Sequence, residues 1–384
     1  MNSDNKLPHW ADVLATSVFG HLRHSNLTHL STICLCIDDN KTPSVIRKII
    51  TFELLVKSLK KIGMNILNPH ICFTGAPESD EVHCKNILTK LSTFLSPDAT
   101  SNYELNDAIL IKFNSDETCH HMIEQNQTII LPDVQVRVKG LNSNNQETLP
   151  IYAILDCFET DLIRWLVAHQ SLNTSLTFHF DDEITKLYKL FDENEARYFE
   201  QTTNENADLP YENIAYKYSY IHDTIPPNRP FRPDFLKLAT LLQMYDLDIS
   251  SAYAYHIHLL KNDLDKSSFS KRSEKIYNWL NLFAPATCKF SVNKHPIEIS
   301  LNEKELSFMK NVFNFIKSYE DEVEFEDLDE IGKRFEMFSK EKGLEFSHAK
   351  TVLYRHLIGK NEGPTFSSFV KYLDRNKILM LLRK

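Results

Sequence analysis

The chain has 384 residues, of which 42% are hydrophobic and 25% charged, and these proportions exclude a disordered or fibrous protein. At roughly 100–200 residues per domain, this length predicts two or three domains. No apolar run approaches the ~18 residues that a membrane-spanning helix needs, and the polar N-terminal stretch lacks the apolar centre of a secretory signal. Because the seven cysteines are scattered over a long chain, we expect a protein of the reducing cytoplasm.

The net charge of −9 hides an asymmetry in the last part of the sequence. Residues 320–330 hold eight acidic side chains, whereas residues 333–384 hold twelve Lys or Arg against five Asp or Glu. A basic segment of this kind favours a polyanionic partner, and the acidic run is a candidate contact for a protein partner. Only eight glycines occur, without a cluster, which argues against a glycine-rich phosphate-binding loop.

The first third of the chain alternates between strand and helix patterns. Apolar runs typical of buried strands occupy residues 33–37, 71–73 and 108–113, and residues 134–138 alternate in polarity as a further strand does. Pro43 precedes a helical pattern over residues 45–61, which Gly63 ends, and a second helical pattern follows the strand at 71–73. Strand, helix and strand in this order predict a parallel, right-handed unit of the Rossmann type, and therefore an α/β fold.

From about residue 160 onward the pattern is almost wholly helical. Apolar residues recur at helical spacing over 306–316, 346–353 and 366–373, and Gly359 ends the middle pattern. Residues 225–233 contain four prolines, which cannot continue a helix and form a stiff spacer. The sequence therefore predicts an α/β region followed by an all-α helical region.

Sixteen histidines raise the question of a metal site. His9, His21, His24 and His29 lie near the N-terminus, and His120 and His121 are adjacent. A zinc site needs a spacing such as Cys-x2-Cys with matching partners, and Cys34-x-Cys36 is one residue too tight for the common form. Ordinary surface and core histidines account for this pattern, so no metal site is expected.

Three other groups of residues have both a chemical and a structural interpretation. They are Cys84 beside His83, Asp38 with Asp39 after a strand, and the acidic run at 181–183. Adjacent helical residues point in different directions, which argues against a nucleophile and base at 83–84. Aspartates at strand ends can be catalytic, but they also begin loops and cap helices. We favour the structural interpretation in each case and assign no catalytic residue.

Residues 349–364 read Ala-Lys-Thr-Val-Leu-Tyr-Arg-His-Leu-Ile-Gly-Lys-Asn-Glu-Gly-Pro and resemble the end of class I lysyl-tRNA synthetases. In that family a helix closes with Leu-Gly-Lys, a charged pair and Gly-Pro before a final helical segment. Further matches follow in the family's order at residues 9–12, 160–169, 178–192, 231–243 and 278–285. The order and spacing carry the resemblance, which is good from about residue 155 to 384 and patchy over 9–150.

Two catalytic signatures of the family are altered in this chain. The family's ATP site needs Pro-Ser-Gly and a His-Ile-Gly-His-type motif, whereas here Thr-Pro-Ser at 42–44 leads directly into the helical pattern. A Lys-Met-Ser-Ser-Ser-Lys-Gly signature should precede the helix at 160, but residues 139–147 carry Leu141 and Gln146 in place of its lysines. Those lysines offset phosphate charge. The chain is also short for the family, and the resemblance implies that the missing length belongs to the catalytic half.

The resemblance implies a truncated Rossmann-like region at 1–157, a helical stem-contact-like connector at 158–225 and an α-helical anticodon-binding-like region at 226–384. It implies a pseudoenzyme that binds tRNA, with lysine tRNA as the first candidate, through the helical C-terminal region without aminoacylation. The alternatives are a residual lysine–tRNA ligase, which would use ATP, and a protein-partner-binding module acting through residues 320–330. No cofactor is expected outside the ligase alternative.

The candidate tRNA-binding residues are cations of the basic segment, namely Lys350, Arg355, Lys360, Lys371, Arg375 and Lys377. Aromatic side chains among them can stack unpaired bases, although helical spacing favours a core position for Phe366 and Phe369. We expect joint replacement of Arg355, Lys360 and Arg375 by Ala to weaken tRNA binding with little change in fold, provided that these side chains are exposed.

Overall fold

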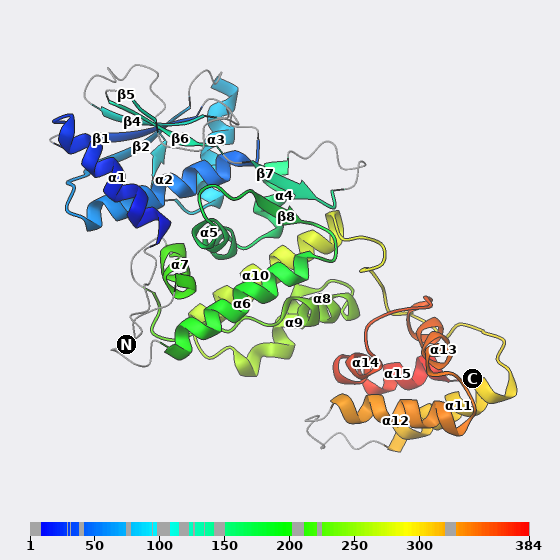
Figure 1. The fold of residues 1–384 in the computed structure, drawn as a ribbon. Coiled ribbons are helices and arrows are strands. Elements are labelled where there is room, and N and C mark those ends of the chain that lie inside the picture. The colour runs from blue at the N-terminus through cyan, green and yellow to red at the C-terminus, as the bar shows by residue number, and fades with distance from the viewer. Residues whose placement is uncertain are drawn as a thin grey trace. The chain divides into compact units, whose positions relative to one another are not determined.

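The structure, a computed structural model (Figure 1), describes residues 9–28, 30, 32–37, 42–73, 78–93, 95–97, 108–114, 123–125, 127–133, 135–141, 150–201, 211–220, 225–318 and 328–383. The chain forms two compact units, Met1–Arg232 and Pro233–Lys384. The division between them falls inside the proline-rich segment at 225–233. None of the described helices is both long and apolar enough to cross a membrane.

The first unit contains a six-stranded sheet (Figure 1). Its strands are β1 (Thr32–Ile37), β2 (Asn68–Phe73), β3 (Ser96–Pro97), β4 (Ala108–Asn114), β5 (Ile123–Gln125) and β6 (Thr128–Pro132). Their order is β3-β2-β1-β4-β6-β5, and every neighbouring pair is parallel except β5 with β6. On the central strand β1, Leu35 lies opposite Ile71 and Ile111. Five of its six residues are buried, as expected for a parallel strand covered on both faces.

Seven helices and a small second sheet complete the described part of this unit. The helices are α1 (Trp10–His24), α2 (Ser44–Lys61), α3 (Glu78–Lys90), α4 (Pro150–Cys157), α5 (Thr160–His169), α6 (Ile184–Gln201) and α7 (Tyr211–Ser219). Helix α1 packs on α2, and α5 packs on both α2 and α7. The second sheet pairs β7 (Val136–Lys139) with β8 (Leu176–His179) in parallel.

A buried ion pair joins three helices of the first unit. Arg164 of α5 and Glu53 of α2 are both at most 1% exposed, and Arg164 Nη1 lies 2.5 Å from Glu53 Oε2. Arg164 Nε also donates to the carbonyl of Ser219 in α7 at 2.8 Å, and the Thr93 hydroxyl donates to Glu53. Because an unpaired charge would be costly in this interior, the pair fixes how α2, α5 and α7 pack together.

In the second unit, every described element of regular structure is helical. These elements are α8 (Phe235–Met244), α9 (Ile249–His256), the short 3₁₀ helix η3 (Ile257–Leu259), α10 (Asp263–Leu282), α11 (Glu303–Ser318), α12 (Leu328–Glu341), α13 (Phe346–Ile358), α14 (Phe366–Tyr372) and α15 (Arg375–Leu382). Helix α8 packs on α10, α11 packs on α12 and α15, and α12 packs on α14.

The predicted fold class, α/β followed by a helical region, is confirmed. The strands predicted at 33–37, 71–73 and 108–113 are β1, β2 and β4, and the helix predicted at 45–61 is α2. Gly63 and Gly359 have φ of 96° and 66° just after α2 and α13, as predicted for glycines that end helices. Two details are corrected. The strand predicted at 134–138 corresponds to β7, which pairs with β8 outside the main sheet, and β8 interrupts the region predicted as almost wholly helical.

Candidate nucleic-acid interface

The strand order of the six-stranded sheet reverses between β1 and β4, the usual position of a ligand cleft in an open α/β sheet. Helix α2 follows β1, so its first turn lies at the carboxyl edge where such a cleft opens. Lys48 in this part of α2 is 6% exposed, and its Nζ lies 2.9 Å from Asp133 Oδ2. Asp133 directly follows β6 at the same edge. The ammonium group of Lys48 is therefore already paired with a carboxylate of the protein itself.

Arg47, the neighbour of Lys48, is also committed to protein groups. Its guanidinium donates to the backbone carbonyls of Thr174 at 2.6 Å, Leu172 at 2.6 Å and Ser171 at 3.0 Å. Burial lowers the pKa of Arg47 to about 10, against the opposing effect of Asp133, so the group stays charged at neutral pH. Both cations in the first turns of α2 thus hold the helix against its surroundings.

The loop that stands in place of the second family signature begins at the end of β7. Lys139 accepts a backbone hydrogen bond from Phe180 at 2.8 Å, and Gly140 has φ of 78°. A Cβ added at Gly140 would lie 2.5 Å from the backbone nitrogen of Asp181, so this position needs glycine for space as well as for its φ. Residues 142–147, including Gln146, lie outside the described residues.

The sequence left both a chemical and a structural interpretation for residues 83–84, 38–39 and 181–183. The members of these groups that the structure describes make contacts that support the fold. His83 Nδ1 lies 2.6 Å from the Tyr152 hydroxyl, and Cys84 is buried. Asp181 Oδ1 accepts from the Glu183 backbone N–H at 3.1 Å just before α6 begins, as a helix-start residue does. Among the described residues, no group of three or more His, Cys, Asp or Glu could hold a metal ion. Asp38, Asp39, His29, His120 and His121 lie outside the described part of the chain.

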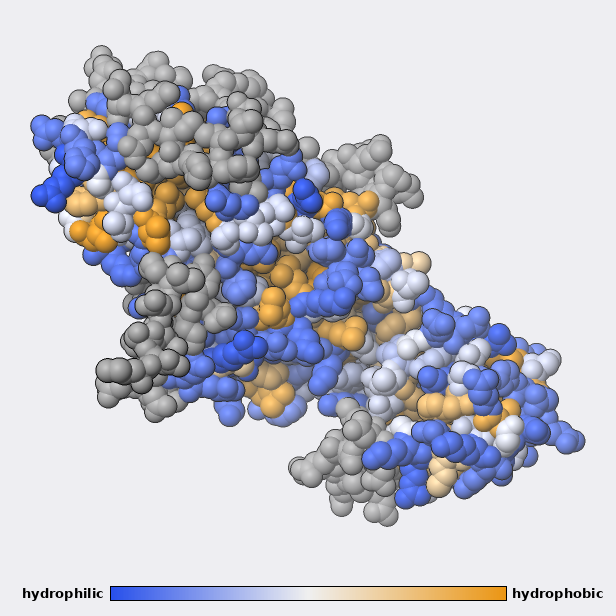
Figure 2. Space-filling view, viewed as in Figure 1, coloured by the Kyte–Doolittle hydropathy of each residue, from blue (hydrophilic) through white to orange (hydrophobic). Residues whose placement is uncertain are grey.

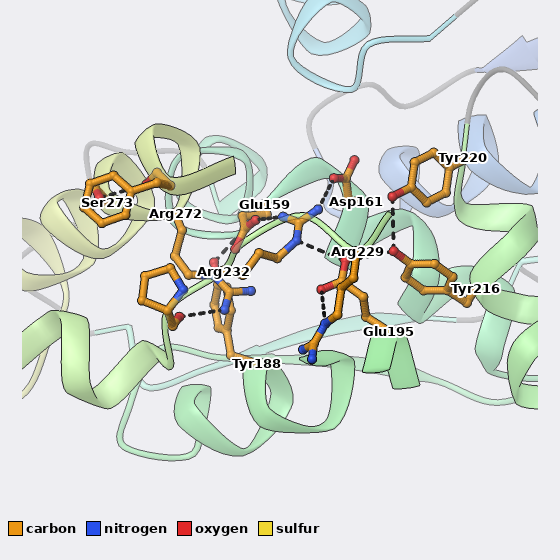
Figure 3. A network of polar contacts seen from close by, with 12 residues as sticks. Glu159, Asp161, Tyr188, Glu195, Tyr216, Tyr220, Arg229, Arg232, Arg272 and Ser273 are labelled. Atoms are coloured by element: carbon orange, nitrogen blue, oxygen red, sulfur yellow. Dashed lines mark hydrogen bonds and ion pairs between the residues drawn. The ribbon is translucent and has the colours of Figure 1, made fainter. Parts of the chain in front are cut away.

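A cluster of buried charges holds the end of the first unit (Figure 3). The side chain of Arg232 is 2% exposed and points among three carboxylates from α5, α6 and the residue before α5. It pairs with Glu159, with Asp161 Oδ2 at 2.8 Å and with Glu195 Oε1 at 3.1 Å. Burial alone would lower the pKa of Arg232, but the three carboxylates hold it well above its usual value. We refer to these four residues as the Arg232 cluster.

Two tyrosines and a second arginine extend the Arg232 cluster through Glu195 (Figure 3). The Tyr216 hydroxyl donates to Glu195 Oε1 at 2.8 Å and lies 3.1 Å from the Tyr220 hydroxyl. Arg229 Nε lies 3.4 Å from Glu195 Oε2. Burial and the neighbouring Glu195 carboxylate raise the pKa of Tyr216, which therefore stays protonated. The cluster anchors the proline-rich segment to α5 and α6, and its partners are all groups of the protein.

Three of the six candidate tRNA-binding cations keep their charged groups available on the second unit. Lys350 is exposed, with its Nζ 5.0 Å from the centre of the Phe346 ring. Arg355 is exposed and donates from Nε to Asn361 Oδ1 at 2.9 Å. Lys371 is half-buried, with its Nζ 5.7 Å from the Tyr372 ring. A phosphate could approach each of these three groups without breaking a contact to the main chain.

The other three candidates bind backbone carbonyls. Arg375 donates from Nε to Ile316 at 2.9 Å and from Nη2 to Lys317, which are the last turn of α11. Lys360 donates to the carbonyls of Ala286 (3.0 Å) and Lys289, and Lys377 donates to that of Lys294 (3.3 Å). The expectation that Arg355, Lys360 and Arg375 can be replaced together with little change in fold requires exposed side chains. Arg355 and Lys360 are exposed, whereas Arg375 is half-buried. Replacing Arg375 would remove a donor from carbonyls in the last turn of α11, whereas the Ala286 carbonyl also accepts from the Lys289 backbone N–H at 3.4 Å.

A pocket that the sequence did not reveal lies in the same unit. Its volume is about 540 Å³, and α11, α12, α13 and α14 each contribute to its wall. Aromatic rings, two lysines and two glycines line it, including Phe346, Lys350 and Gly332. The only signal in the sequence is Gly332 within an otherwise helical stretch, since glycine is unfavourable in a helix interior.

The core interpretation favoured for Phe366 and Phe369 agrees with their burial, at 7% and 0% exposed.

These observations define a two-unit protein, in which a Rossmann-like α/β unit is followed by a helical unit that carries exposed cations.

No protein-family model matches the chain. It is 30% identical over 189 residues to the lysine–tRNA ligase of Methanosphaera stadtmanae, covering 44% of this chain and 33% of that protein. It is 28% identical over 258 residues to the lysine–tRNA ligase of Pyrococcus horikoshii, covering 65% and 48%, and 22% identical over 258 residues to that of Treponema pallidum, covering 64% and 47%.

The chain is therefore lysyl-tRNA synthetase-like, and the resemblance seen in the sequence is confirmed. It spans about half the length, or less, of these curated relatives.

Proposed function

We propose that this protein binds tRNA through its helical second unit without aminoacylating it, in the cytoplasm, with lysine tRNA as the first candidate. The observation that carries the proposal is the similarity to lysine–tRNA ligases from several organisms. The name of these relatives specifies tRNA as a substrate. A protein that keeps the helical region and loses the catalytic signatures would act in translation as a tRNA-binding pseudoenzyme.

The exposed cations of the second unit support RNA binding. Lys350, Arg355 and Lys371 lie on α13 and α14, and none of them donates to a backbone carbonyl in the contacts described above. Each cation that neutralises a phosphate releases condensed counterions, so binding should weaken steeply as salt rises. The net charge of −9 argues against indiscriminate binding of nucleic acid and favours an RNA that fits this face.

The first turns of α2 support the loss of aminoacylation. A class I site would need groups at this sheet edge that meet the ATP phosphates, and the sequence lacks the family's glycine- and histidine-bearing motif after Ser44. Lys48 and Arg47, the nearby cations, bind Asp133 and the carbonyls at 171–174 instead. Losing several phosphate contacts, each worth ~3 kcal/mol, would slow adenylate formation by many decades.

The binding test compares two sets of variants with a labelled lysine tRNA transcript. Replacing Lys350, Arg355 and Lys371 together by Ala should weaken binding at least about tenfold and flatten its salt dependence. The matched control replaces Arg23, Lys60 and Lys217, three exposed cations of the first unit, and should bind like the parent. Equal losses in both sets would mean that net charge alone governs binding. If the parent binds no tRNA at micromolar concentrations, the protein-partner alternative replaces the proposal.

The catalytic test is lysine-dependent exchange of pyrophosphate into ATP. We expect no turnover above a protein-free blank. Turnover that Ser44→Ala abolishes would favour the residual ligase alternative, with ATP as its cofactor. The protein-partner alternative rests on the acidic run at 320–330, which lies almost wholly outside the described residues.

A further inference from the structure

A second pocket of the helical unit differs in size and chemistry from the one described above. Its volume is about 260 Å³, and α11, α13 and α15 contribute to its wall. This volume is below the ~300–1,000 Å³ of drug-sized sites but well above the ~150 Å³ of an apolar cavity that admits benzene. A small ligand with one ring, or a chain of similar size, therefore fits it. None of its lining residues belongs to the cations proposed above for tRNA.

The floor of this second pocket is apolar. Met309 and Leu382 are each 4% exposed, and the unbranched side chain of Met309 can adapt to the shape of a ligand. The buried ring of His356 is also part of the wall, and its Nδ1 donates to the Val352 carbonyl at 2.8 Å, which fixes the orientation of the ring. Figure 2 shows hydrophobic residues reaching the surface among hydrophilic ones on the helical unit. The apolar lining residues are Leu301, Leu306, Met309, Phe313 and Leu382.

The open side of this pocket is cationic. Lys310 and Arg383 line it and are both exposed, and neither side chain makes an ion pair or a hydrogen bond within the part of the chain that the structure describes. Asn314, also exposed, adds the N–H donors of its amide. Among the described residues that line the pocket, none is acidic. An anion can therefore be met by two positive charges that give up no contact of their own.

We propose that this pocket binds a small apolar carboxylic acid in its ionised form. The apolar part lies against Met309 and Leu382, and the carboxylate meets Lys310 and Arg383. Burial of the apolar part drives binding, and charge-assisted hydrogen bonds to the two cations select a carboxylate over a neutral molecule. A free amino acid is disfavoured, because its ammonium group would lie beside the same two cations. The site goes beyond the proposed tRNA binding and does not depend on it.

The test uses the full chain with carbon-13 in the methyl groups of its seven methionines, and 3-phenylpropanoate as the probe. Met309→Leu identifies the Met309 signal in the NMR spectrum by its loss. Titration of the parent with 3-phenylpropanoate should shift the Met309 signal until it saturates. The neutral amide of the same acid, 3-phenylpropanamide, should bind about tenfold more weakly, because it forms no charge-assisted hydrogen bond. Phenylalanine, which adds an ammonium group, should also bind more weakly than the acid.

Charge-removing variants assign the carboxylate to the two cations. Lys310→Met and Arg383→Met change exposed side chains, so both variants should fold, and each should bind 3-phenylpropanoate about tenfold more weakly with little change for the amide. The matched control is Lys304→Met, which removes an exposed cation of α11 that does not line the pocket and should bind like the parent.

Three results would overturn this inference. They are a Met309 signal that does not move at about 10 mM 3-phenylpropanoate, equal affinity of the parent for the acid and its amide, and equal losses in Lys304→Met and the two pocket variants. Each of them leaves the proposed tRNA binding standing, because the cations proposed for tRNA lie outside this pocket.

Discussion

Arg232 is a buried cation on which several carboxylates of the first unit depend. It faces Glu159 and Glu195, which are 2% and 0% exposed, so removing the guanidinium takes a counter-charge from two buried carboxylates and leaves Arg229, 3.4 Å away, beside Glu195. We expect Arg232→Met to lower the free energy of unfolding by about 3–5 kcal/mol in urea titrations followed by tryptophan fluorescence.

The matched control for Arg232→Met is Arg197→Met, which breaks an exposed pair with Glu193 at 3.8 Å. That substitution should cost less than ~1 kcal/mol, because solvent screens the pair. Equal destabilisation by the two substitutions would show that the Arg232 cluster contributes no more to the free energy of unfolding than a surface ion pair does.

His9 makes the first unit sensitive to mild acid. It is 1% exposed, its Nε2 lies 2.9 Å from the carbonyl of Ala168, and its Nδ1 accepts from the Ala11 N–H at 3.2 Å. A second proton would have to enter at Nδ1, facing another donor. Burial lowers the pKa of His9 to about 4, against opposing contributions from Ala168 and Asp12.

Since an unfolded histidine titrates at about pH 6.5, the unfolded chain binds the extra proton first as pH falls. Stability should therefore be full above pH 6.5 and fall between about 6.5 and 4, by at most about 1.4 kcal/mol per pH unit from this group. The measurement is the unfolding free energy of the parent and of His9→Gln at pH 7 and pH 5. The parent should lose more, and parallel pH profiles would contradict the assignment to His9.

At the level of elements, Arg375 links α15 to the end of α11. Its guanidinium satisfies carbonyls in the last turn of α11, which have no partner within their own helix. Arg375→Ala should lower the free energy of unfolding of the second unit by about 1–3 kcal/mol, measured by denaturant titration of the helical circular dichroism signal. Lys350→Ala, at an exposed position on α13, should change it by less than ~0.5 kcal/mol. The reverse order of effects would return Arg375 to the set of cations available to RNA.

The elements that could be predicted are those whose signal is local. The buried run of β1 and the helical period of α2 are properties of a few consecutive residues, and both elements are found where expected. The sequence did not predict β8, because four residues of alternating burial give too short a pattern to recognise. This strand is stabilised by β7, which lies about 40 residues earlier in the chain. The same limit applies to the site. Counting charges suggested Arg375 as a phosphate ligand, but its carbonyl partner Ile316 lies 59 residues away in sequence.

At the level of the whole molecule, the two compact units predict separate folding. A fragment spanning residues 228–384 contains all of the second unit and its helical core, so it should unfold cooperatively with strong helical circular dichroism. For the first unit, the comparison is between a fragment of residues 1–232 and a fragment of residues 1–228. The shorter fragment lacks Arg229 and Arg232 and should melt earlier, because the carboxylates of the Arg232 cluster lose their counter-charges. A non-cooperative melt of 228–384 would show that the helical unit depends on the first.

The contacts of Arg47 and Lys48 also constrain how such a chain can evolve. An insertion after Ser44 that formed a glycine- and histidine-bearing turn would shift the start of α2 and pull both cations from their partners. Each uncompensated buried charge costs several kcal/mol, a large share of the ~5–15 kcal/mol that keeps a domain folded. A nucleotide-binding turn could therefore be accommodated here only after neutral residues had replaced the two cations, so the order of mutations, and not only their number, decides whether such a turn is compatible with the fold.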